Sequence, residues 1–215
     1  MDQHEAAHGE LVADDLVANE RAARRCLWLG QLEQARLYLL ALSREYLRRV
    51  YAGTFRPDET VAALAAALLA RGPAGVQALV PALEACLDLY GDAGRLGLVA
   101  QFAAVAQAYP SSDDAPSPAL PPAEAAVSQA LQAIERRDGA ALAAALRALA
   151  RLRLLRLNGA AAPGDDPGAG VDLPLGALAQ LALHLGCPLP DLDLDLDKAL
   201  LGTVPPALVH TAPAW

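Results

Sequence analysis

The sequence is poor in aromatic residues, poor in cysteine and almost free of lysine. Aromatic residues make up 4% of its 215 positions, although 54% of the positions are hydrophobic. Alanine and leucine supply most of that apolar fraction, and both are strong helix formers. The β-branched residues that favour strands are few. This composition predicts an all-α fold of closely packed antiparallel helical hairpins, in one bundle-like or repeat-like domain over residues 1–215.

Long apolar runs are also missing. None approaches the ~18 uninterrupted apolar residues that span a bilayer. The first ten residues, MDQHEAAHGE, are acidic and contain no apolar core of a secretory signal. The cysteines Cys26, Cys86 and Cys187 are isolated and odd in number, as expected for buried free thiols in a reducing compartment. We therefore expect a cytoplasmic protein that has no membrane partner.

Basic residues are fewer than acidic residues, and the formal net charge is −8. Nonspecific nucleic-acid binding depends on neutralising phosphates, so nucleic acid is not an expected partner. The charge is uneven: residues 20–56 carry eight arginines and three glutamates, whereas residues 163–215 carry seven aspartates and one lysine. Either the two ends pair with each other or remain solvated, or the acidic end faces a basic partner.

Helix start and stop signals divide the chain into short helical segments. The expected spans are 10–29, 31–51, 59–70, 74–90, 94–109, 123–137, 140–157 and 173–185. Gly30 and the Asp138-Gly139 pair leave connections so short that the flanking helices must be antiparallel. Pro81 is expected to kink or split its helix. Residues 110–122 and 158–171, rich in Pro, Gly, Ser and Asp, are expected to be an exposed connector and an exposed loop.

The first expected hairpin has a repeat-like turn. In LGQLEQARLYLLAL, Gly30 precedes Ala35 by five residues and Leu39 by nine. That spacing is similar to the turn and second helix of a tetratricopeptide-type repeat. No 34-residue recurrence follows, so the sequence does not predict a repeat array.

Four aspartates near the C-terminus alternate with leucines. In a strand, whose side chains have a period of two, Asp191, Asp193, Asp195 and Asp197 lie on one side. The residues do not fit a calcium loop, because Leu196 stands where the loop needs glycine and no terminal glutamate follows. The pattern fits a solvated edge strand or a partner-binding surface. Together with Asp165 and Asp166 in the preceding loop, these residues are the predicted partner-binding set.

Catalytic patterns are scarce. The stretch from His4 to His8 reads H-E-x-x-H, but it begins at the fourth residue, and His184 and His210 lack the spacing of a third zinc ligand. Cys187 follows His184 by three residues, which we interpret as a buried thiol and a core histidine. No phosphate-binding loop or serine nucleophile motif occurs. We therefore predict a protein that is not an enzyme and holds no metal or cofactor.

The arginine-rich N-terminal hairpin has paired positions on its helices. Arg21 and Arg25 are four residues apart, as are Arg44 and Arg48, so each pair shares a helix face. Single-strand binding would need aromatic stacking and further cations. Solvated faces and internal ion pairs are the favoured interpretation.

The C-terminal region resembles a known family. The segments AIERRDGAALAAALRALARL and LPLGALAQLALHLGCPL, then an acidic extended stretch and KALLGTVPPALV, resemble the C-terminal region of the immunity protein 49 family, over Ala133–Leu208. The resemblance implies a helical antidote of a bacterial polymorphic-toxin system, which would occlude its toxin through an acidic surface. The helical hairpins leave a second interpretation open, an adaptor or scaffold that holds a peptide or partner helix. A homodimer is compatible with both.

Overall fold

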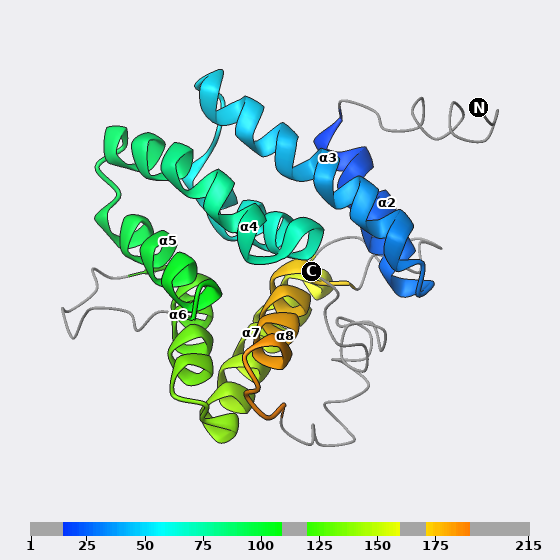
Figure 1. Cartoon of the computed structure of the whole chain (residues 1–215), viewed down its shortest axis with the longest axis vertical. Coiled ribbons are helices and arrows are strands. Elements are labelled where there is room, and N and C mark those ends of the chain that lie inside the picture. Colours follow the sequence, from blue (N-terminus) through cyan, green and yellow to red (C-terminus); the bar gives the residue numbers. More distant parts are fainter. Residues whose placement is uncertain (1–14, 109–119, 160–170, 190–215) are drawn as a thin grey trace.

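A computed structural model describes residues 15–108, 120–159 and 171–189, without the side chains of residues 153–159. These residues form helices and contain no strand, which confirms the all-α prediction. Figure 1 shows α4 between the α2–α3 hairpin on one side and α5 on the other. The elements in chain order are α2 (Leu16–Trp28), α3 (Leu32–Tyr51), η1 (Pro57–Glu59), α4 (Thr60–Leu89), α5 (Ala93–Ala106), α6 (Pro122–Glu135), α7 (Gly139–Gly159) and α8 (Leu173–His184).

The element α4 is two antiparallel helices that meet at Gly72. Gly72 has φ 62° and ψ −152°, a backbone conformation that is essentially restricted to glycine. A straight helix of this length would measure about 45 Å. Instead, the Tyr90 hydroxyl after its end donates to the Phe55 carbonyl oxygen before its start, at 3.3 Å. The predicted stop at Arg71-Gly72-Pro73 is therefore confirmed, with helical halves at residues 60–71 and 73–89.

The reversal at Gly72 also bears on the resemblance of this segment to a membrane-spanning helix. Residues Pro57–Leu89 are long and apolar enough to cross a membrane, and 61% of their most apolar window is buried inside the protein. Each half is shorter than the ~20 residues that a spanning helix needs. The apolar side chains of both halves pack into the core, which holds Leu64, Leu68 and Leu83 without solvent exposure.

Several helices end in the same left-handed turn, seen clearly after α4 and α6. Gly91 has φ 66°, and the next amide, that of Asp92, donates to the Leu87 carbonyl at 3.1 Å. Arg137 occupies the corresponding position after α6 with φ 54°, and the Asp138 amide donates to the Ala133 carbonyl at 2.8 Å. This is the Schellman arrangement, which favours glycine.

Replacing Arg137 by glycine is expected to stabilise the protein by about 0.5–1 kcal/mol, because glycine removes the left-handed strain at a smaller entropic cost. Urea unfolding measures the effect. The matched substitution Gly91→Ala places an alanine in the same conformation and is expected to lower stability by a similar amount. Equal midpoints for the wild type and both variants would contradict this account of the turns.

The helix α8 lies in the interior of the helical array. It packs against α4, α6 and α7, which come from both halves of the described chain. Leu173, Leu175, Leu178 and Leu181 are at most 1% exposed. Its N-cap is Asp172, as the sequence predicts, and the carboxylate accepts the Leu175 amide at 3.0 Å. A helix that is apolar all round is expected to be buried on every side, and α8 is.

Some predicted boundaries differ from the structure. Pro81 lies within α4 with no break in the helical backbone angles, so the expected split there is wrong. Pro81 is exposed, on the outer side of the helix. The helix α7 continues through Asn158 to Gly159, and Val171 is buried, so the loop predicted at 158–171 is shorter. The predicted extended acidic segment lies outside the described residues, as does most of the connector predicted at 110–122.

Candidate functional site

The predicted partner-binding aspartates are not among the described residues. Asp165 and Asp166 lie between α7 and α8, and Asp191, Asp193, Asp195 and Asp197 follow the last described residue, Leu189. The H-E-x-x-H stretch at residues 4–8 also lies outside the described part. These assignments therefore stay predictions from the sequence.

The interpretation of Cys187 as a buried thiol and His184 as a core histidine is half correct. Cys187 is 2% exposed, and its burial raises the pKa of the thiol, so the group is not poised as a thiolate nucleophile. His184, on the last turn of α8, is exposed, which corrects the prediction of a core histidine. Among the described residues, no group of three His, Cys, Asp or Glu side chains could hold a metal ion.

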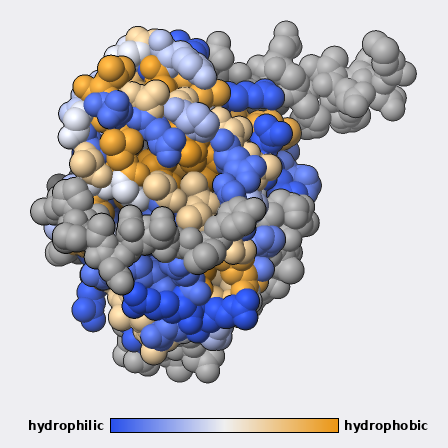
Figure 2. All heavy atoms as spheres, turned by 60° about the vertical axis from the view of Figure 1, so that its left-hand side comes forward, coloured by the Kyte–Doolittle hydropathy of each residue, from blue (hydrophilic) through white to orange (hydrophobic). Residues whose placement is uncertain are grey.

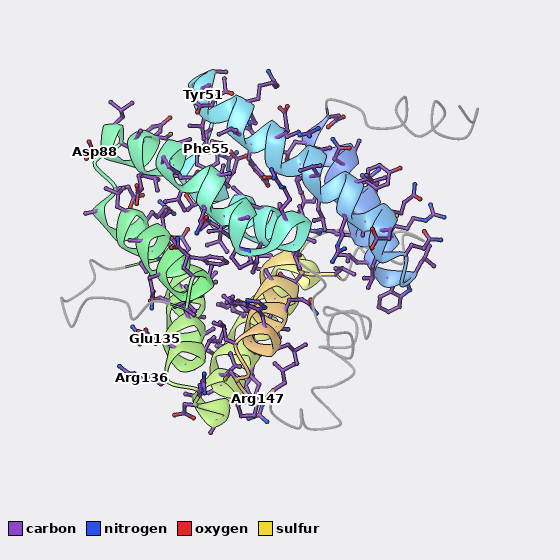
Figure 3. The ribbon with its side chains drawn as sticks, in the orientation of Figure 1. Tyr51, Phe55, Asp88, Glu135, Arg136 and Arg147 are labelled. Carbon is purple, nitrogen blue, oxygen red and sulfur yellow. The ribbon has the colours of Figure 1, made fainter. Side chains whose placement is uncertain are left out.

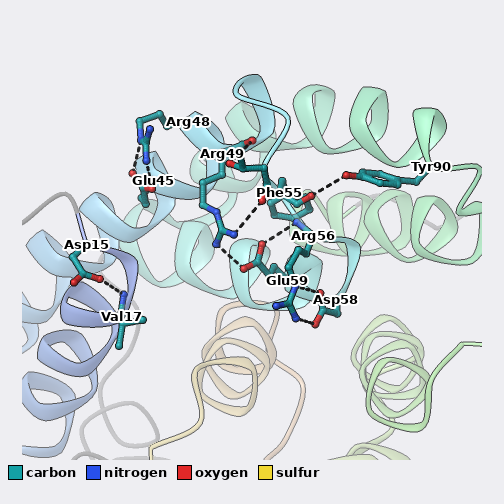
Figure 4. Close-up of polar contacts among 11 residues, drawn as sticks. Asp15, Val17, Glu45, Arg48, Arg49, Phe55, Arg56, Asp58, Glu59 and Tyr90 are labelled. Carbon is teal, nitrogen blue, oxygen red and sulfur yellow. Dashed lines mark hydrogen bonds and ion pairs between the residues drawn. The ribbon is translucent and has the colours of Figure 1, made fainter.

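A polar network joins α3 to α4, and Figure 4 shows its bonds. Arg49 donates to the Glu59 carboxylate at 2.6 Å and to the Thr54 carbonyl at 3.1 Å. The other oxygen of the Glu59 carboxylate accepts the Arg56 amide at 2.9 Å, and the Arg56 guanidinium pairs with Asp58. These contacts tie the end of α3 to η1, so the network holds the loop that leads from α3 into α4.

Two buried aromatic side chains, those of Tyr46 and Phe55, lie in the core near this network. The rings of Tyr46 and Phe55 meet edge to face with centroids 6.3 Å apart. Burial raises the pKa of the Tyr46 hydroxyl well above its usual range, and the nearby carboxylates of Glu20 and Glu59 raise it further. The hydroxyl therefore stays protonated at any physiological pH, which suits a packing role rather than proton transfer.

A second charged cluster joins α5 to α6. Arg95 donates to Glu124 at 2.9 Å and to Asp92 at 2.6 Å, and its guanidinium is mostly buried. One oxygen of Glu124, Oε2, is buried without a hydrogen-bond partner among the described atoms. Nearby, the Ser128 hydroxyl donates to the Gln101 side-chain oxygen at 2.7 Å. Both contacts cross the interface between the two helices, so they position α6 on α5.

These ion pairs predict a loss of stability in acid. The Arg48 guanidinium lowers the pKa of Glu45, and although burial opposes the shift, the amide and guanidinium of Arg95 lower the pKa of Asp92. A carboxylate whose pKa is lower in the folded state stabilises the fold above its unfolded pKa. That contribution disappears as the pH falls through the folded pKa, so the free energy of unfolding is expected to decrease below about pH 4.

Urea titrations at several pH values between 7 and 3 measure this dependence. Asp92→Asn keeps a side chain that caps helices well but removes the charge, so this variant is expected to lose less stability between pH 7 and pH 3 than the wild type. An identical loss in both proteins would contradict the assigned role of Asp92.

The outer side of the α2–α3 hairpin has a different character. Arg21, Arg25 and Arg44 are exposed and make no ion pair with the rest of the described chain. Large apolar side chains of the same hairpin are also exposed, including Tyr51 at 78% and Leu29 at 53%. We call this set the hairpin surface. Its members are Val17, Arg21, Arg25 and Trp28 on α2, Leu29 directly after it, and Leu37, Arg44, Arg48 and Tyr51 on α3.

The prediction for the arginines is therefore correct in both its parts. Arg24 pairs with Glu20, Arg36 with Glu33 at 3.2 Å, and Arg48 with Glu45 at 2.6 Å, which are internal pairs of a single helix. The exposed arginines face solvent. The sequence did not single out the apolar side chains beside them, because only the packing of α3 on α4 decides which side of the hairpin faces outward.

The α4–α5 side of the protein exposes small apolar residues. Figure 2 shows that apolar residues gather in the upper part of this side and hydrophilic residues in the lower part. Ala74, Ala78 and Ala85 of α4 are exposed, and so are Gly97 and Ala100 of α5. Leu89, at 89% exposure, is the large apolar residue at the end of α4.

Comparisons with protein-family models, with curated proteins and with solved structures found no match for this chain.

Proposed function

We propose that this chain is an immunity-type protein that binds a bacterial toxin in the cytoplasm and neutralises it by covering the toxin's active site. The observation that carries the proposal is the hairpin surface. Arginine, tryptophan and tyrosine dominate the binding energy of protein interfaces, and this surface exposes Arg25, Trp28 and Tyr51 together with leucines. Such a surface supports protein binding as the activity.

The sequence supplies the more specific part of the proposal. The C-terminal part of the sequence carries the predicted partner-binding set, Asp165, Asp166, Asp191, Asp193, Asp195 and Asp197, which we call the acidic pole of the sequence. Complementary charge speeds association and selects the partner, so this pole would meet a basic active-site cleft. The resemblance over Ala133–Leu208 to the immunity protein 49 family supports a toxin as that partner.

Charge reversal tests the acidic pole. In cells that express the toxin, Asp193→Lys with Asp195→Lys is expected to reduce protection, because repulsion replaces attraction at the basic cleft. Growth of cells that carry the wild type or the variant measures the effect. Reversal of Glu84 and Asp88, which both lie on α4, serves as the matched control. Full protection by the 193/195 variant would exclude these residues from the interface.

The second candidate function is an adaptor that holds a peptide or a helix within its array of hairpins. The tight antiparallel connections favour such an array. However, the chain's own helix α8 occupies the inner side, where it contacts α4, α6 and α7. That position leaves the outer surfaces for a partner, so the immunity-type function is the better supported of the two.

A further inference from the structure

The hairpin surface differs in charge from the chain that carries it. Residues 15–51 contain seven arginines and four carboxylates, whereas the whole chain has a net charge of −8. Three of the four carboxylates, Glu20, Glu33 and Glu45, are already engaged by arginines of their own helices. The hairpin is therefore a basic region on an acidic protein.

Its exposed side chains on α3 follow one line. Leu37, Arg44, Arg48 and Tyr51 are separated by seven, four and three residues, which places them on one face of the helix. They cover about 21 Å along the axis. All four are exposed, with Leu37 at 47% and Tyr51 at 78%. The line therefore has two cationic groups between two large apolar side chains.

The neighbouring helix repeats this combination. On α2, Arg21, Arg25 and Trp28 are spaced by four and three residues and are exposed, with Trp28 at 40%. Val17 and Leu29, at 59% and 53%, lie near the two ends of the same helix. Both helices of the hairpin therefore expose arginines together with large apolar side chains. The exposed line on α3 is as long as a partner helix of about 15 residues.

We propose that the hairpin surface binds an acidic amphipathic segment of a partner protein, whose leucine-like side chains contact Trp28, Leu37 and Tyr51 while its carboxylates pair with the exposed arginines. Charge complementarity selects such a segment, and the exposed apolar groups supply the contact area. The partner is a protein rather than a nucleic acid, because the surface exposes large apolar side chains among its arginines, whereas nucleic-acid affinity depends on neutralising many phosphates. This assignment rests on the proposed function and deepens it, because it names the kind of segment that the hairpin surface of a protein-binding chain would hold.

Trp28 provides a direct reporter for the experiment. The chain has two tryptophans, so Trp215→Phe leaves Trp28 as the single fluorophore of the full-length protein. The probe is a synthetic 16-residue helical peptide with leucine on one face and glutamate on the other. Two further peptides serve as controls, one with glutamine for glutamate and one with serine for leucine. We expect the acidic amphipathic peptide to shift the Trp28 emission and to bind at least tenfold more tightly than either control peptide.

Matched variants of the protein test where the peptide binds. Arg25→Glu with Arg44→Glu changes two exposed arginines of the hairpin surface and is expected to weaken binding at least tenfold. Arg136→Glu with Arg137→Glu makes the same change of charge at the α6–α7 turn, where Figure 3 places Arg136 far from the hairpin, and is expected to bind like the wild type.

Three results would overturn the proposal. One is equal binding by both double variants. Another is binding of a 20-nucleotide single-stranded DNA as tightly as the peptide, which would assign the surface to nucleic acid. The third is a concentration-dependent dimer that Arg25→Glu with Arg44→Glu abolishes, since the occupant would then be a second copy of this chain. The peptide titration is made without toxin, and protection is measured in cells, so a failure of this proposal can be distinguished from a failure of the proposed function.

Discussion

Gly75→Ala is expected to destabilise the protein by about 3 kcal/mol, because the added methyl group has no room. A Cβ atom built on Gly75 lies 2.2 Å from the carbonyl oxygen of Ala67 and 3.0 Å from the Cβ of Arg71. The first of these atoms belongs to the backbone of the opposite half of α4 and cannot rotate away. The two halves of α4 would have to separate, and α3, α5 and α8 all pack on them.

The measurement is equilibrium unfolding in urea, followed by circular dichroism. Gly97→Ala is the matched control, since Gly97 is an exposed glycine inside α5 and alanine is the better helix former there. That substitution is expected to raise stability by up to about 1 kcal/mol. If the two alanine variants shift the midpoint in the same direction by the same amount, the close approach at Gly75 is not a constraint on the fold.

Leu181→Ala is expected to cost 2–5 kcal/mol, roughly the range for a large side chain removed from a packed core. Leu181 is 0% exposed and lies on α8, the helix that joins α4 to α6 and α7. The cavity would open at the centre of the fold rather than at its edge. Since small domains have a total stability of about 5–15 kcal/mol, one such change removes a large share of it.

Urea unfolding again provides the measurement, and Leu89→Ala is the control. Leu89 is 89% exposed, so its removal is expected to change stability by less than about 0.5 kcal/mol. A cost below about 1 kcal/mol for Leu181→Ala would mean that α8 does not organise the core.

The local features of the fold could be predicted from the sequence because they depend on neighbouring residues. The stop at Gly72-Pro73, the tight turn before Gly139 and the N-cap at Asp172 each follow from the conformational preference of one or two residues. The continuous helix through Pro81 was not predicted. Pro81 lacks the backbone N–H that would donate to the preceding turn, but this missing hydrogen bond lies on the exposed side of the helix. The backbone angles at Pro81 stay helical.

The interactions between distant segments could not be predicted. Arg49 pairs with Glu59 across a loop and Arg95 pairs with Glu124 across 29 positions, and each contact needs the packed helices to exist first. The central position of α8 has the same origin. The apolar sequence of α8 predicts that the helix is buried. It does not predict which elements cover it, because the packing of the whole array decides that α4 is the main one.

The hairpin surface is the clearest case of a feature that only the structure could identify. The sequence indicates that Arg21 and Arg25 share a face, yet Trp28, Leu37 and Tyr51 resemble ordinary core residues of amphipathic helices. Leu37 and Tyr51 are exposed because α3 buries a different face, with Leu39 and Leu42, and Trp28 is exposed because α2 buries the face with Ala23 and Leu27. Exposure of large side chains beside arginines is therefore the observation that points to protein binding.

Co-expression of this chain with each polypeptide encoded beside it tests the central claim, protein binding that neutralises a toxin, most directly. Growth of the cells and the mass of any purified complex are the measured quantities. The proposal predicts that one neighbouring polypeptide arrests growth alone, and that this chain restores growth and forms a stable complex with it. Persistent growth arrest beside a well-folded chain, with no complex formed, would contradict the claim.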